Sequence, residues 1–164
     1  MNYHKFNAPD EILTVNVHPY LLKEYNRRWF LICAAETDGK ILNFGLERIN
    51  NVNPLPAHKY VEYNGDINEI FEDIVGVTNY TEKEVLKILF WVSDVSKDYV
   101  TSKPLHDSQR YYRGDADKTC RIQYPMLHGG SFFSIECKEN YELIRELTSY
   151  GENLVVLSPR CIID

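Results

Sequence analysis

The chain has 164 residues, of which 44% are hydrophobic and 26% charged, so it can form one ordinary domain or two small ones. No apolar stretch approaches the roughly 20 residues of a transmembrane helix, and the N-terminus lacks the charged and apolar segments of a secretion signal. The net charge is −6, and residues 62–84, with seven acidic residues and one lysine, carry that excess, so no long basic face for wrapping duplex DNA is expected.

Short strands are predicted over the first sixty residues, at Tyr3–Phe6, Leu13–Leu21, Trp29–Ala34 and Ile41–Ile49. Asp38-Gly39 lies between two apolar runs, which is a strong hairpin signal, so we expect a tight turn at Thr37–Lys40. Strands this short with tight connections predict a small β-barrel over residues 1–60.

A connector is predicted for residues 61–84. It follows Asn50–Ala57, which is a loop by composition because it holds three asparagines and two prolines in eight residues. Asp66 and Glu69 have the spacing of a capping box, so a short acidic helix is expected from there to about Ile74.

Strand and helix patterns alternate over the remaining residues, 85–164. We predict strands at Val85–Val92, Thr119–Tyr124, Ser131–Cys137 and Asn153–Leu157, and helices at Ser96–Ser102 and Asn140–Tyr150. In the last helix Asn140 is the predicted N-cap, and Gly151 lies just past the end. The order strand, helix, strand, strand, helix, strand is that of a ferredoxin-like βαββαβ unit, and the predicted fold class is α+β.

Basic and aromatic residues are interleaved ahead of the Trp29-Phe30-Leu31 run. Guanidinium and ammonium groups bind phosphate, and aromatic rings stack on bases, so this pattern suits a nucleotide or a short single strand. The residues concerned are Tyr20, Lys23, Tyr25, Arg27, Arg28 and Trp29. The alternative is a solvated turn whose aromatic side chains fill the core.

Arg48 is the sharpest candidate for ligand binding. Strict alternation along Ile41–Ile49 would place it on one face with Leu42, Phe44 and Leu46. Because burial of an unpaired guanidinium is costly, it must have a fixed acidic partner, be turned outward by a bulge, or await an anionic ligand. Glu47, Glu24 and Asp38 are the candidate structural partners.

Other polar groups give weaker signals. The four cysteines are spaced too widely for a metal or redox motif, so we expect reduced, mostly buried thiols in a cytoplasmic protein. The five histidines show no i, i+4 pairing, so no metal or other cofactor is expected. Lys103, His106 and Arg110 lie in one polar loop that suits either an anion site or a simple turn after Pro104.

The segment from His18 to Ile49 resembles the WYL-domain family, ligand-sensing modules of bacterial transcriptional regulators. Trp29-Phe30-Leu31 stands in the place of the Trp-Tyr-Leu triplet, and Leu46–Ile49 where the family often has Leu-Asp-Arg-Ile. Two blocks near the C-terminus, Tyr150-Gly151 and Leu157–Pro159, fit the same resemblance. With Phe30 in place of tyrosine, a ligand contact through a hydroxyl at that position is lost.

The resemblance implies an Sm-like or SH3-like barrel with a ferredoxin-like C-terminal extension, and it places Arg48 in the proposed ligand groove. WYL regulators usually carry an N-terminal helix-turn-helix that binds promoter DNA. We expect that segment to be absent from this chain, because its first strand is predicted within a few residues of Met1.

We therefore expect a non-enzymatic sensor that forms a homodimer and binds a nucleotide or a short single-stranded nucleic acid. Two alternatives come from other functional classes. One is a structural or dimerisation module of a regulator, with Arg48 paired internally and no ligand of its own. The other is an enzyme acting on nucleotides, with His106 or His18 and a nearby carboxylate as the acid–base pair, although none of the common catalytic motifs is present.

Overall fold

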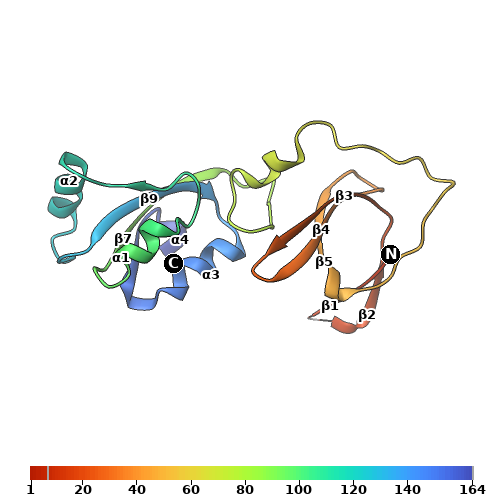
Figure 1. Ribbon diagram of the computed structural model, residues 1–164, viewed down its shortest axis with the longest axis horizontal. Helices are drawn as coiled ribbons and strands as arrows, with labels where there is room; N and C mark the ends of the chain where they lie inside the picture. The colour runs from red at the N-terminus through yellow and green to blue at the C-terminus, as the bar shows by residue number, and fades with distance from the viewer. Residues whose placement is uncertain (7, 164) are drawn as a thin grey trace. The chain divides into compact units, whose positions relative to one another are not determined.

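The computed structural model describes residues 1–6 and 8–163, with the backbone alone at position 9, and the chain divides into two compact units (Figure 1). The first unit is Met1–Glu69, and the second begins at Ile70. Each has a hydrophobic core of its own. Within the described residues, no helix is both long and apolar enough to span a membrane.

The first unit contains two three-stranded antiparallel sheets, one in the order β2-β1-β6 and one in the order β3-β4-β5 (Figure 1). The strands are β1 (Asn2–Lys5), β2 (Ala8–Thr14), β3 (Val17–Tyr25), β4 (Arg28–Ala35), β5 (Ile41–Gly45) and β6 (Ile49–Asn51). Strand pairing over the described residues leaves these as separate sheets, so the predicted closed barrel is not present.

The prediction of a single strand over Leu13–Leu21 is wrong, because β2 and β3 belong to different sheets. The two residues between them bond to different neighbours: the Val15 amide donates to the Met1 carbonyl at 3.0 Å, and the Asn16 carbonyl accepts from Glu36 at 3.0 Å. Neither residue is glycine or proline, so the sequence carries no local signal for the break.

Two hairpin turns build the β3-β4-β5 sheet. The β3–β4 turn is only Asn26-Arg27, with φ of 51° and 64°, so both residues adopt the left-handed conformation of a two-residue hairpin. The predicted turn at Thr37–Lys40 is confirmed: Gly39 has φ of 70°, and its amide donates to the Ala35 carbonyl at 2.9 Å.

The strand predicted at Ile41–Ile49 ends early, at Gly45. A 3₁₀ helix, η1 (Leu46–Arg48), follows and delivers the chain to β6 in the other sheet. Because the strand does not continue, the alternation that would place Arg48 on the same face as Phe44 does not apply. Arg48 instead lies at the junction of the two sheets.

The core of the first unit is made by one face of the β3-β4-β5 sheet and by β1. Leu31 lies opposite Phe44 in register, and Phe44 packs against Tyr3 with ring centroids 4.7 Å apart. Trp29 is on the Leu31 side and Phe30 on the opposite side, because side chains alternate along a strand. Leu31 is therefore part of the core, whereas Trp29 at the strand's outer end is half exposed.

The second unit has one four-stranded antiparallel sheet in the order β10-β7-β9-β8. Its strands are β7 (Val85–Val92), β8 (Arg110–Tyr111), β9 (Ser131–Lys138) and β10 (Leu154–Ser158). Its helices are α1 (Lys97–Ser102), α2 (Asp115–Gln123), α3 (Tyr141–Ser149) and α4 (Arg160–Ile163). Two 3₁₀ helices complete the described elements, η2 (Ile67–Phe71) and η3 (Gly151–Asn153).

Most of these elements confirm the prediction, but the strand expected at Thr119–Tyr124 is wrong, because this segment belongs to α2. Ion pairs one turn apart favour the helix, with the Arg121 side chain donating to Asp117 at 2.8 Å. The second strand of the predicted βαββαβ order is instead the very short β8.

The predicted acidic helix is also shorter than expected. Asp66 accepts a hydrogen bond from the Asn68 amide at 2.9 Å, but only the 3₁₀ helix η2 follows.

Asn140 connects α3 to the segment that precedes β7. Its side-chain oxygen accepts from the Leu143 amide at 2.8 Å, as an N-cap, and its nitrogen donates to the carbonyls of Val75 and Thr78, both at 2.8 Å. The residue is only 2% exposed, so water cannot replace these bonds.

We predict that Asn140→Ala lowers the free energy of unfolding by about 2 to 4 kcal/mol, since it removes a helix cap and the two hydrogen bonds to the carbonyls of Val75 and Thr78. Asn140→Asp keeps the cap acceptor but replaces the donor, so it should also destabilise. Urea denaturation of the two variants measures both effects. A near-neutral Asn140→Asp would contradict the bridging role.

The cysteines give a second prediction. All four are free, and three are buried; burial raises the pKa of the Cys33 and Cys137 thiols to about 12. Only the thiolate reacts with disulfide reagents, so at pH 8 the exposed Cys161 should react rapidly in the native protein while Cys33 and Cys137 react only after unfolding. Mass spectrometry of the labelled cysteines checks this order.

Candidate functional site

Arg48 lies against two aromatic rings of the N-terminal strand region. Its guanidinium carbon is 4.3 Å from the ring centroid of Phe6 and 4.9 Å from that of Tyr3. Tyr3 is buried, whereas Phe6 is 67% exposed. A cation over aromatic faces is stabilised by the ring quadrupole, so these rings fix the position of the charge without neutralising it.

The nearest acid to Arg48 is shared with a second arginine. Glu47 Oε1 is 3.6 Å from Arg48 Nε and also 3.6 Å from Arg28 Nη1. Both distances are too long for good hydrogen bonds, and Arg48 Nε is fully covered without a hydrogen-bond partner among the described residues. We define Arg28, Glu47 and Arg48, together with Tyr3 and Phe6, as the arginine cluster.

The turn after β5 creates this arrangement. A Cβ at Gly45 would come within 2.9 Å of both Glu47 carboxylate oxygens and 3.0 Å of Arg48 Nη2, so a larger residue there would displace the ends of these two side chains. Burial raises the pKa of the Tyr3 phenol, opposed by the charge of Arg48 and by a backbone hydrogen bond at Gly45. Tyr3 therefore stays neutral, and the cluster holds two cations and one carboxylate.

Two further predicted residues lie on the sheet face of Arg28. In register, Tyr25 is directly opposite Arg28, and Lys23 is opposite Phe30, two residues along the same face. Phe30 in turn lies opposite Gly45. Lys23 and Tyr25 therefore extend the cluster's face along the β3–β4 hairpin, and both already make contacts within the protein.

The remaining predicted residues lie elsewhere. Trp29 is on the other face, opposite Glu24, and Arg27 is exposed in the two-residue turn. Tyr20 lies towards the opposite end of β3, where its ring contacts those of Tyr60 and Tyr63 at centroid distances of 6.4 and 5.5 Å. The sequence pattern thus grouped residues that the strand register separates.

Sequence reasoning missed the aromatic part of the cluster. Tyr3 and Phe6 were predicted only as strand residues, and they meet Arg48 through the pairing of β1 with β6. Nothing local in the sequence indicates a contact across that distance. Glu47 was identified as one of three candidate partners, and its contact with Arg48 is the one that forms.

The two histidines of the enzyme alternative serve local structure. His106 Nδ1 is 2.7 Å from Ser108 Oγ, and this hydroxyl also donates to the Glu136 carbonyl at 3.0 Å, tying the loop to β9. His18 Nδ1 accepts from the Val61 amide at 3.3 Å. Across residues 1–6 and 8–163, no group of three or more metal-ligating side chains is assembled.

Comparison with known proteins identifies the first unit. No curated protein matches the sequence. Among solved structures, "Proteasome accessory factor B/C (PafBC) of Arthrobacter aurescens" is similar, with 14% identity and a TM-score of 0.39 over 98% of this chain. The chain spans only 22% of the length of that protein. Residues 1–54, which carry the arginine cluster, match the family model of the WYL domain.

Proposed function

We propose that the chain is a ligand-sensing, non-enzymatic regulatory module of a bacterial transcriptional regulator, and that its arginine cluster binds an anion, such as a nucleotide or a short single-stranded nucleic acid. The WYL domain over residues 1–54 supports the regulatory role. The observation that carries the ligand class is that Arg28 and Arg48 share one carboxylate, while Arg48 Nε is covered and unpaired among the described residues.

A phosphate or phosphodiester group offers what Glu47 does not. It has several strong acceptor oxygens, so it can accept short, charge-assisted hydrogen bonds from both guanidinium groups at once. Binding would add hydrogen bonds near 2.8 Å from the accessible nitrogens of two guanidinium groups whose contacts to Glu47 are both 3.6 Å. The exposed ring of Phe6, adjacent to Arg48, offers a surface on which a base can stack.

The other predicted residues take graded roles in this proposal. Lys23 and Tyr25 would contact the ligand beyond Arg28, on the same sheet face. Arg27 and Trp29, exposed at the end of the β3–β4 hairpin, would contact only a longer strand. We assign Tyr20 to packing against Tyr63 rather than to the ligand.

Within a regulator, we propose an Sm-like or SH3-like WYL unit at residues 1–60, a connector at 61–84 and a ferredoxin-like extension at 85–164. The strand order β10-β7-β9-β8 supports the last part, with α2 inserted between β8 and β9. The extension would support a homodimer in the cytoplasm. The ligand would act by preferring one arrangement of the helix-turn-helix DNA-binding partners over another.

The second candidate function is a structural module without a ligand. The proximity of Glu47 to both arginines favours it, because the cluster then is an internal ion pair. Partly exposed ion pairs at this distance contribute little to stability, which is why we prefer the ligand site. The two functions differ in what substitutions at Arg48 and Glu47 do.

We predict that Arg48→Met weakens binding of nucleotides or short single-stranded DNA about 10- to 100-fold, as expected for loss of about 1.5 to 3 kcal/mol from a charged hydrogen bond. Methionine keeps most of the apolar stem. Titration calorimetry at two salt concentrations measures the effect, and Arg145→Met, at an exposed position of α3, is the matched control. Equal affinities for both variants would contradict the proposed site.

Glu47→Gln separates the two candidate functions. In a ligand site, Glu47 competes with the anion for Arg28 and Arg48, so its neutralisation should tighten anion binding several-fold. In a structural module the same change should only lower the midpoint of urea unfolding. Binding titration and denaturation of the one variant give both answers, and unchanged affinity with lowered stability would favour the structural module.

A further inference from the structure

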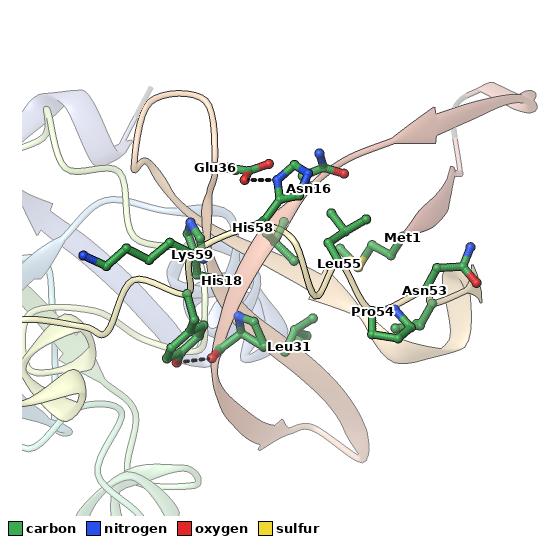
Figure 2. A pocket seen from close by; sticks show the side chains of 14 residues that line it. Met1, Asn16, His18, Leu31, Glu36, Asn53, Pro54, Leu55, His58 and Lys59 are labelled. Atoms are coloured by element: carbon green, nitrogen blue, oxygen red, sulfur yellow. Dashed lines mark hydrogen bonds and ion pairs between the residues drawn. The ribbon is translucent and has the colours of Figure 1, made fainter.

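A separate pocket of about 280 Å³ lies in the first unit, where the segment after β6 passes over the β3–β4 hairpin (Figure 2). None of its lining residues belongs to the arginine cluster. Its apolar walls include Val17, Pro19, Leu31, Val52, Pro54 and Leu55. Its polar side chains include His18, Glu36, His58 and Lys59.

His18 is the key polar group of this pocket, because it is only 9% exposed yet one of its nitrogens has no partner. Nδ1 accepts from the Val61 amide at 3.3 Å, so the neutral ring carries its hydrogen on Nε2. Nε2 makes no hydrogen bond to any described residue, and it is not one of the fully covered unpaired atoms, so it remains an accessible donor at the pocket. A group inside the pocket would therefore be its partner.

The charged side chains around the pocket indicate which kind of ligand group would accept a hydrogen bond from His18 Nε2. Glu36 is already occupied by His58, whose Nδ1 lies 2.5 Å from its Oε1, and hydrogen bonds from His58 and Asn16 hold the pKa of Glu36 below its usual value. Glu36 is thus an ionised but satisfied carboxylate. Two donors in the lining suit an anion, namely His18 Nε2–H and the exposed Lys59 ammonium, and the Asn53 amide can either donate or accept.

We propose that this pocket binds a small monocarboxylate with an apolar ring or branched chain. The carboxylate would accept from His18 Nε2 and Lys59, and the apolar part would fill the space against Leu31 and Leu55. The volume lies just below the usual range for ligand pockets, roughly 300 to 1,000 Å³, so a single ring is the appropriate size.

The segment that covers the pocket is the part of the chain whose order ligand binding would change. Residues 52–66 have no regular secondary structure and lead along the chain to the second unit, which begins at Ile70. Three contacts hold this segment to the sheet. His58 contacts Glu36, the Tyr60 hydroxyl donates to the Pro19 carbonyl at 2.8 Å, and the Val61 amide donates to His18 Nδ1. A ligand that adds contacts from Val52 to Lys59 would order it further.

The test uses the whole chain and three probes of one shape: benzoate, benzamide and benzylammonium. We expect ¹H–¹⁵N NMR titration to show that benzoate binds at least tenfold more tightly than benzylammonium and shifts His18 and residues 52–61. Benzoate should also slow protease cleavage within that segment. Absence of benzoate binding, or tighter binding of benzylammonium, would overturn the proposal.

Single substitutions test whether benzoate binds in this pocket. Leu55→Trp fills the pocket from an exposed position and should weaken benzoate binding at least tenfold, whereas Val61→Trp, exposed in the same segment but outside the lining, should not. His18→Asn keeps an acceptor for the Val61 amide but has no donor at the position of Nε2, whereas the longer side chain of His18→Gln can place its amide donor near that position. We expect the asparagine variant to bind about tenfold more weakly and the glutamine variant to recover affinity.

This site and the arginine cluster are separable by experiment. Arg48→Met should leave benzoate binding unchanged, and Leu55→Trp should leave nucleotide binding unchanged. Loss of benzoate binding in Arg48→Met with retention in Leu55→Trp would show that the carboxylate binds the arginine cluster and would overturn the second site.

Discussion

The chain leaves β5 at Gly45 through a tight turn that connects the two sheets of the first unit. Glu47 folds back over the backbone of Gly45 so closely that a methyl group there would meet its carboxylate at 2.9 Å. The 3₁₀ helix η1 follows Gly45, leads the chain from one sheet to the other, and places one acid beside two arginines. The same short turn therefore connects the two sheets and brings the charges of the cluster together.

The second unit shows how far local patterns determine a fold. Val85–Val92 was predicted with the bounds of β7, and α3 was placed by the cap at Asn140 and the glycine at 151. These elements have strong propensity, a clear period and capping residues that agree with one another. The error at Thr119–Tyr124 arose because Cys120 is buried and Ile122 exposed in a helix that touches the sheet along a narrow stripe, so the period is weak.

In the first unit, the predictions failed where tertiary contacts determine the ends of strands and the neighbours of side chains. The break between β2 and β3 depends on backbone bonds to Met1 and Glu36, which no window around Val15 contains. Arg48 was found because a charge in an apolar run is conspicuous, but its aromatic neighbours Tyr3 and Phe6 could not be found, since they approach it only after β1 pairs with β6. The pocket at His18 was missed for the same reason.

The position of η1 also determines where the chain can change in length. One extra residue between Gly45 and Ile49 would shift β6 by one position, reverse the faces of its side chains and separate Glu47 from one of its arginines. Insertions in the irregular segment 52–66 disturb no strand register and cost little loop entropy. Variation in length among descendants of this sequence should therefore collect after β6 and avoid the four residues before it.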